Sequence, residues 1–196
     1  EQVLENQACV EATGLSPIAL LAKHGVLGSD FTAIHATWIS DEDLQLLRIH
    51  DATVGLCPTT EGDLGDGVPR TSDLHDAGVR MCIGSDSHAV IDPFCELRFL
   101  EYQARAQTQS RCVLADEHGF VAPVLARIGS DNGRHSLGFT ANTDSVHIQD
   151  DATAMQETST PFETAIMSGH PGLISSVKVA GTEVVTMGRH HLRSNS

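Results

Sequence analysis

Polar side chains with useful chemistry follow three short apolar runs of the sequence. His35 ends the run that begins at Phe31, Cys57-Pro-Thr-Thr-Glu61 closes the second, and Ser85-Asp86-Ser87-His88 closes the third. Imidazole and carboxylate groups can ligate a metal ion or carry protons during a hydrolysis. Active sites of parallel-stranded folds lie at the carboxyl ends of the strands. The recurrence of polar residues at three such ends therefore predicts one shared site.

Each of these residues also has an ordinary structural interpretation. A single histidine such as His35 often only donates a hydrogen bond, Asp86 could cap the next helix, and 59–67 could be a plain loop. Cys57 has no basic neighbour in sequence, which favours packing over a role as nucleophile. The other histidines are interpreted as surface residues: His24, His50, His75, His118, His135, His147, His170, His190 and His191.

The elements that must position these residues alternate between strand and helix. We expect adjacent parallel strands at 31–35, 53–57 and 80–85, a loop at 59–69, and helices near 18–24, 41–50, 71–78 and 93–107, the last three on one side of the sheet. Ser16-Pro17 and the capping box Ser40-Asp-Glu-Asp43 are helix-start signals. This alternation predicts βαβ units and an α/β fold with a parallel sheet.

The second half of the chain has a different pattern. An apolar helical stretch at 120–128 precedes a polar segment at 129–133, and 144–149 is strand-like. Residues 150–161 are interpreted as a loop, 175–188 as a β-hairpin turning about Gly181-Thr182, and 189–196 as a frayed tail. The chemistry-bearing strand ends are therefore expected in the first half alone.

Composition narrows the class of partner. Lys and Arg number 12 against 26 Asp and Glu, a net charge of -14, which argues against nucleic acid or an anionic membrane as partner. No apolar run approaches the roughly 18 residues of a membrane span. The five cysteines contain no Cys-x-x-Cys pair, which argues against a disulfide scaffold or zinc finger and favours a reducing, cytoplasmic setting. A small-molecule substrate fits this composition.

Several segments together resemble one known family. Gly55-Leu-Cys-Pro-Thr-Thr-Glu61, Leu64-Gly-Asp-Gly67, Gly84-Ser-Asp-Ser-His88 and Glu96-Leu-Arg-Phe-Leu-Glu-Tyr102 resemble the formimidoylglutamate deiminases of the amidohydrolase superfamily. His35-Ala36-Thr37 matches the end of that family's sixth barrel strand, and Glu1-Gln2 the segment after its fifth. The stretch from Ser176 to Arg193 is similar to its closing hairpin.

The resemblance implies a fold. We expect 1–138 to be the C-terminal half of a (β/α)8, TIM-type barrel and 139–196 to be the C-terminal part of a small β-sandwich domain. A barrel cut in this way leaves two bare edge strands, those at 31–35 and 80–85, and uncovered apolar side chains. Because such surfaces drive association, we expect a homo-oligomer.

The resemblance also implies a site. One divalent metal ion, usually zinc, would be held by Asp86, Glu1 would shuttle protons, and His35 would orient and polarise the attacking water. Glu61 and His88 are candidates for the substrate loops. The family's other metal ligands, a His-x-His pair and a fifth-strand His, do not occur in this chain, and Trp38 stands where the family has a second His. The chain alone is therefore expected to be inactive.

The implied activity is hydrolysis of N-formimino-L-glutamate to N-formyl-L-glutamate and ammonia, a step of histidine degradation. Two alternatives stay open. One is a related deaminase acting on a cyclic amidine such as guanine, and the other is a non-catalytic barrel fragment. Near-stoichiometric metal together with ammonia release would separate the enzymes from the non-catalytic alternative.

Overall fold

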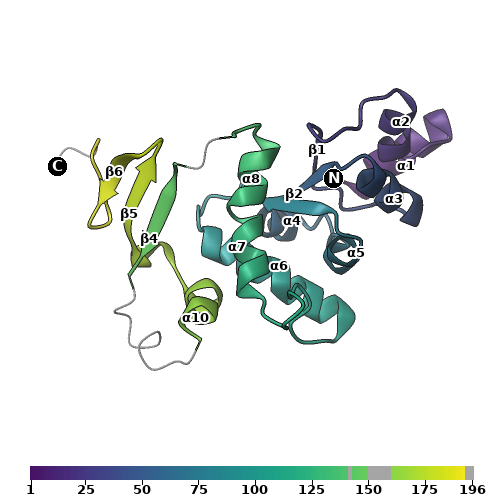
Figure 1. The fold of residues 1–196 in the computed structure, drawn as a ribbon. Helices are drawn as coiled ribbons and strands as arrows, with labels where there is room; N and C mark the ends of the chain where they lie inside the picture. The colour runs from purple at the N-terminus through teal and green to yellow at the C-terminus, as the bar shows by residue number, and fades with distance from the viewer. Residues whose placement is uncertain (141–142, 150–159, 193–196) are drawn as a thin grey trace.

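The computed structural model describes residues 1–140, 143–149 and 160–192. Its first sheet consists of β1 (Thr32–Ile34), β2 (Thr53–Leu56) and β3 (Arg80–Ile83), in the order β1-β2-β3. Both pairs are parallel, with Ile34 opposite Gly55 and Gly55 opposite Cys82. The predicted adjacent parallel strands are confirmed, and Figure 1 shows them surrounded by helices.

The helices at this sheet begin where the sequence signals predict. They are α2 (Pro17–Lys23), α3 (Asp41–Ile49), α5 (Thr71–Asp76) and α6 (Pro93–Thr108). Ser16 Oγ accepts from Ala19 N, and Ser40 and Asp43 form the reciprocal bonds of a capping box. Asp92 caps α6, because its Oδ1 accepts from Phe94 N and Cys95 N, and Pro93 occupies the first helical position.

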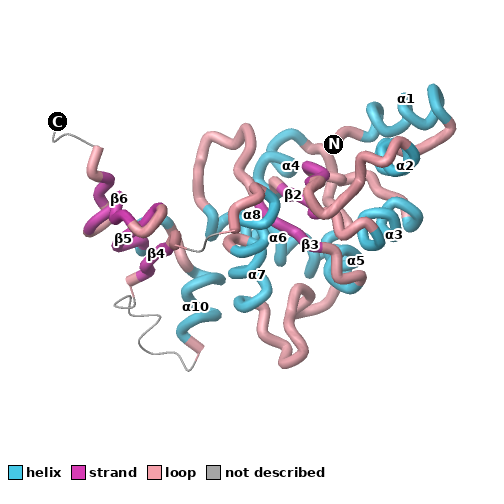
Figure 2. The backbone as a smooth tube through the Cα atoms, turned by 45° about the horizontal axis from the view of Figure 1, so that its top comes forward, coloured by secondary structure: helices cyan, strands magenta, loops and turns pink. Residues whose placement is uncertain are grey.

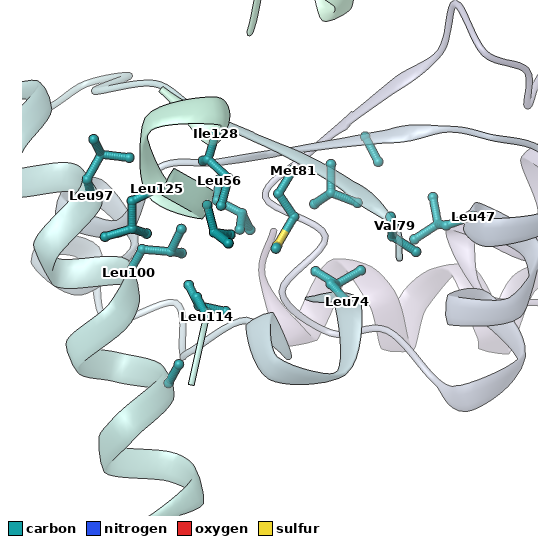
Figure 3. Close-up of a cluster of buried hydrophobic side chains, with 14 of the residues drawn as sticks. Leu47, Leu56, Leu74, Val79, Met81, Leu97, Leu100, Leu114, Leu125 and Ile128 are labelled. Carbon is teal, nitrogen blue, oxygen red and sulfur yellow. The ribbon is translucent and has the colours of Figure 1, made fainter. Parts of the chain in front are cut away.

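One hydrophobic core joins these helices to one face of the sheet. Leu47 of α3, Leu74 of α5 and Leu100 of α6 are fully buried together with Val54 and Leu56 of β2. Figure 3 shows this cluster, in which Met81 lies between Leu100 on one side and Leu74 and Leu47 on the other. Alternation along each strand sends these residues to one face, so helices α3, α5 and α6 share a side as predicted.

The other face of the sheet carries smaller side chains. A Cβ on Gly55 would meet Thr32, Ile34 and Cys82, which places these four residues on the same face. Ile34 is 56% exposed there, so the β1 end of this face is open. We expected the outer edge of β3 to be bare, but it is contacted by α8 (Asp131–Ser136). Asn132 Nδ2 of this helix donates to Met81 O at 2.8 Å.

A second sheet follows in the last third of the chain. Strands β4 (Ser145–Ile148), β5 (Ile174–Val179), β6 (Thr182–Thr186) and β7 (Arg189–His190) are antiparallel in the order β4-β5-β6-β7. Helix α10 (Pro161–Ser168) packs on α6 and on α7 (Ala122–Ile128), and η1 (Pro171–Leu173) leads into β5. The tube in Figure 2 shows the two sheets in separate parts of the molecule.

Four segments differ from the sequence expectation. Helix α1 (Val3–Thr13) was not predicted; its apolar residues form no stripe, and none of its residues is buried. Helix α4 (Pro58–Leu64) replaces most of the predicted loop at 59–69: Pro58 starts it, Gly65 ends it with φ 72°, and Gly62 lets it approach Phe99 of α6.

Helix α8 takes up most of the segment from 129 to 133 that was interpreted only as polar. Residues 189–190 pair with β6 instead of fraying, because Val185 and Thr186 offer an open edge. Most of the loop predicted at 150–161 lies outside the described residues. Within the described part of the chain, no helix combines the length and the apolar character needed to cross a bilayer.

Candidate functional site

The first site residue, His35, is placed by an abrupt change of backbone direction at the end of β1. Its amide donates to Gly55 O at 2.7 Å, which continues the ladder with β2. His35 and Ala36 then adopt φ values of 65° and 46°, in the left-handed region that non-glycine residues rarely occupy. This turn ends the strand, and the His35 side chain lies nearly buried, 11% exposed, at the carboxyl edge of the sheet.

The predicted convergence of Glu1, His35 and Asp86 is present in the structure. His35 Nε2 lies 3.4 Å from Glu1 Oε1 and 3.6 Å from Asp86 Oδ2. Asp86, which also has a positive φ of 47°, follows β3 and keeps its side chain 40% exposed. His35 and Asp86 thus meet at one edge because the parallel strands β1 and β3 end there, and Glu1 reaches the same place from the segment before α1.

Glu61 occupies a different place from the one predicted. It was a candidate for a substrate loop, but α4 carries it into the interior, where it is fully buried. Its Oε1 accepts from Cys57 N at 2.9 Å and lies 3.2 Å from His35 Nδ1. Glu61 therefore contacts His35 on the side of the ring opposite to Glu1 and Asp86.

The residues before Glu61 fix the loop that bears Asp86. Thr60 Oγ1 donates to Ser85 O at 2.7 Å and accepts from His88 N at 3.1 Å. Thr59 binds Glu96 of α6 through its amide, at 3.0 Å, and through its hydroxyl. The first turn of α4 thus connects β2 to the loop after β3 and to α6.

His88, the second substrate-loop candidate, lies on the partly exposed loop after β3. Its Nδ1 accepts from Val90 N at 3.1 Å, so this part of the ring is engaged within its own loop. The structure does not bring His88 into the ring of contacts around His35. Its position still allows a role at the rim of the site, which stays a prediction.

Trp38 and Asp66 form a contact that the sequence did not indicate. The indole N–H donates to Asp66 O at 2.9 Å, and Asn6 Nδ2 donates to Trp38 O at 2.8 Å. The position where the family resemblance placed a second histidine therefore connects helix α1 to the loop that follows α4. A groove of about 370 Å³ lies beside it, lined by Glu1, Trp38 and residues of β1.

Several acidic side chains lie close together at the site. Burial raises the pKa of Glu1, with the neighbouring Asp66 adding to the effect, and burial likewise raises the pKa of Glu61. The pKa of Cys57 rises to about 12, mainly through burial and then through the charges of Glu61, Asp86 and Glu96. In the described residues, no Lys or Arg forms an ion pair with Glu1, Glu61 or Asp86.

These donors fit a divalent cation. One ligand atom each from His35, Cys57 and Asp86 lies within 4.8 Å of the others. Imidazole and carboxylate are ligand types of zinc, and a cation would offset the negative charge of the carboxylates. Asp86 is the most accessible of the three, whereas Cys57 is buried and, with its raised pKa, protonated at neutral pH, in keeping with the predicted packing role.

Comparison with known proteins connects this geometry to a family. The Amidohydrolase family pattern matches residues 1–156. Formimidoylglutamate deiminase of Pseudomonas aeruginosa is 28% identical over 200 residues, which cover 97% of this chain and 44% of that protein. A 5-methylthioadenosine/S-adenosylhomocysteine deaminase of Thermococcus kodakarensis is 35% identical over 141 residues, covering 72% of this chain and 32% of that protein.

Solved structures show the same fold. The crystal structure of an amidohydrolase from Brucella melitensis superposes with a TM-score of 0.89 at 32% identity, covering 98% of this chain and 44% of that one. An adenosine deaminase from Xanthomonas campestris with bound zinc gives a TM-score of 0.89 at 21% identity, covering 99% and 46%.

The chain thus spans less than half the length of these relatives. The three parallel β/α units of the mixed α/β fold are consistent with part of the barrel of these structures. The match covers four-fifths of the sequence and includes every residue of the site described above, and the chain belongs to the amidohydrolase family.

Proposed function

We propose that this chain is the C-terminal portion of a metal-dependent hydrolase that cleaves the C–N bond of an amidine and releases ammonia. The observation that carries the proposal is the meeting of Glu1, His35 and Asp86 at the carboxyl ends of the parallel strands. The proposed substrate is N-formimino-L-glutamate, which would give N-formyl-L-glutamate in histidine degradation. The Pseudomonas aeruginosa relative and the Cys57-to-Glu61 motif support this choice.

In overall balance, water adds to the formimino carbon, the C–N bond breaks, and nitrogen leaves as ammonia with both water protons. A divalent ion, proposed to be one zinc held in part by Asp86, would make hydroxide available near neutral pH. The carboxylate of Asp86 can also accept a proton from the attacking water.

The other two side chains would act on the same atoms. His35 would orient the water and stabilise charge as the tetrahedral intermediate forms. Glu1 lies 3.4 Å from His35, and its raised pKa suits a group that holds a proton and passes it to the departing nitrogen.

A second candidate substrate is a cyclic amidine. The Thermococcus kodakarensis relative carries the name of a 5-methylthioadenosine/S-adenosylhomocysteine deaminase and is 35% identical over its aligned part. Deamination of such a ring uses the same addition of water and loss of ammonia, so the site described here would serve either substrate. The guanine-type alternative belongs to the same class, and a non-catalytic fragment is the remaining alternative.

The deciding experiment is ammonia release by the native protein that contains this chain. N-formimino-L-glutamate, 5-methylthioadenosine and guanine would be compared with added zinc and after chelation. We expect zinc-dependent turnover that is fastest with N-formimino-L-glutamate. Faster turnover of a purine would select the second candidate. A protein that binds no metal and hydrolyses no amidine even with added zinc would contradict the proposal.

The arrangement of the whole protein is likewise proposed. Residues 1–138 would complete a (β/α)8 barrel and 139–196 a small β-sandwich. The cytoplasm is proposed as the location from the cysteine content of the sequence. A homo-oligomer is proposed for this chain on its own, because the β1 end of its sheet is open where Ile34 is 56% exposed. Sedimentation of the purified protein tests the oligomer, and a monomer at micromolar concentration would contradict it.

A further inference from the structure

A fully buried carboxylate, that of Glu61, contacts His35 on its Nδ1 side, opposite to Glu1 and Asp86. One oxygen of Glu61, Oε1, lies 2.9 Å from Cys57 N and 3.2 Å from His35 Nδ1. Its other oxygen, Oε2, is buried with no hydrogen-bond partner among the described residues. The shared oxygen is therefore the polar atom through which Glu61 reaches both the end of β2 and the imidazole.

The partners of this oxygen determine where the imidazole proton lies. A backbone amide such as Cys57 N–H can only donate, so Glu61 Oε1 acts as an acceptor. If Glu61 carried a proton, the unpartnered Oε2 would be its place. The hydrogen bond between Oε1 and His35 Nδ1 then requires the proton to be on Nδ1.

We infer that Glu61 is a positioning residue that holds His35 in the Nδ1–H tautomer and directs the lone pair of Nε2 toward the gap between Glu1 and Asp86. The tautomer of a histidine is set by the hydrogen bond that its other nitrogen makes. His35 Nε2 can then accept a hydrogen bond from a water molecule in the site, which fixes the direction of that water.

The opposite side of the ring supports this assignment. Nε2 lies 3.4 Å from Glu1 Oε1 and 3.6 Å from Asp86 Oδ2. A charge-assisted N–H···O bond to a carboxylate would normally be about 2.7–2.9 Å long. Both separations exceed this length, and neither contact has the geometry of a hydrogen bond, whereas the 3.2 Å contact of Nδ1 with Glu61 Oε1 has it. This difference is expected when Nε2 carries a lone pair and does not donate to the carboxylates.

A second buried glutamate of the chain has a purely structural role and can serve as a control for Glu61. Glu101 is also fully buried, and it accepts from Val113 N at 3.0 Å and Leu114 N at 2.9 Å while pairing with Arg105. It fixes backbone without contacting the site. Glu101→Gln therefore controls for the loss of a buried carboxylate as such.

The test is long-range ¹H–¹⁵N correlation NMR of the native protein labelled in histidine, with His35 assigned from the spectrum of His35→Gln. We expect a protonated, pyrrole-type Nδ1 and an unprotonated, pyridine-type Nε2. Glu61→Gln should keep this pattern, since its amide oxygen can still accept from Cys57 N–H and Nδ1–H. Glu61→Met should lose it, and Glu101→Gln should leave it unchanged.

Two results would overturn the inference. One is a wild-type His35 that carries its proton on Nε2, a measurement that needs no variant to fold. The other is an unchanged His35 pattern in Glu61→Met whose circular dichroism shows a folded protein.

The catalytic consequence rests on the proposed function. Glu61→Met should lower kcat about 10–100-fold with little change in KM, the usual size of an effect on an orienting partner, and Glu61→Gln should restore most of it. If the wild-type protein hydrolyses no amidine, the proposed function fails while the NMR result still decides the tautomer. If kcat of folded Glu61→Met equals that of wild type, the positioning role is wrong even where the activity is confirmed.

Discussion

The two sheets of this chain show how strand direction determines where chemistry can gather. In the parallel sheet β1-β2-β3, all strands end at one edge, and His35, Cys57 and Asp86 follow those ends. In the antiparallel sheet β4-β5-β6-β7, successive strands end at opposite edges. Polar residues there, such as His147 and His190, are separated along the ladder and form no comparable group in the described residues.

The two sheets also differ in how deeply their residues are buried. All four residues of β2 are buried, whereas the residues of β5 and β6 are half-buried or exposed. Among the described residues beyond 140, Ile166 is the buried member of the main core and Met167 packs against it, both from α10. The parallel sheet therefore supplies both the site and most of the core, and we expect substitutions in the two sheets to have different consequences.

The largest contrast should come from removing a carboxylate. In the native protein, Asp86→Ala should abolish metal binding at the site and lower turnover by more than about 10³-fold, since the metal is worth several kcal/mol to such a reaction. Asp144→Ala is the matched change near the antiparallel sheet, where Asp144 Oδ1 accepts from Ala180 N at 2.7 Å. Metal analysis and the ammonia assay should find that variant unchanged. Full metal content in Asp86→Ala would remove Asp86 as a ligand.

The second largest contrast should appear in the rates of thiol labelling, between Cys57 beside the parallel sheet and exposed cysteines elsewhere. With a pKa of about 12, Cys57 is a thiolate in about one molecule in 10⁴ at pH 8, and it is buried as well. Because the pKa is raised, its reaction rate should increase with pH up to about 12. Exposed Cys112 and a Val179→Cys probe on β5 should react at least about 10³-fold faster, as measured by mass spectrometry of alkylated peptides. Rapid labelling of Cys57 in folded protein would contradict its buried placement.

Replacing the site histidine should have a smaller effect on turnover than removing Asp86. His35→Ala should leave metal bound and lower kcat about 10²-fold, because the imidazole acts on water and on developing charge. His147→Ala on β4 keeps the backbone carbonyl that accepts from Ser175 Oγ and should behave as wild type. Loss of metal from His35→Ala would show that His35 is a ligand, a role that its grouping with Cys57 and Asp86 also allows geometrically.

The parts of the site that could be predicted from sequence are those fixed by topology. His35 and Asp86 converge because parallel strands must end together, and the strands were visible as apolar runs between cap signals. The contact between Glu61 and His35 could not be predicted in this way, since it depends on α4, and the glycines and aspartates of 59–69 indicated a loop. Pro58 followed three residues later by Glu61 was the overlooked helix signal.

Exposed or local elements were missed for a related reason. Helix α1 buries no residue, so periodicity, which detects a buried face, had nothing to detect. The bond from Trp38 to Asp66 O joins a side chain to a backbone carbonyl 28 residues away, and backbone partners leave no trace in residue types. Sequence patterns therefore predicted the strands and their ends, and tertiary packing determined which side chains support them.

The smallest predicted contrast concerns stability and uses one substitution in both sheets. Val54→Ala removes two methyl groups from a fully buried position of β2, where the surrounding leucines of α3 and α5 cannot fully close the space. We expect a loss of about 2 kcal/mol in the free energy of unfolding from the transfer and cavity terms. Val179→Ala on β5 removes the same groups from a side chain that is 51% exposed, and should cost about 0.5 kcal/mol or less. Urea unfolding of both variants, with the denaturant slope held equal to wild type, gives the two values. Equal losses would show that the antiparallel sheet packs against a further surface in the native protein, and that the difference in burial between the sheets does not persist in the native assembly.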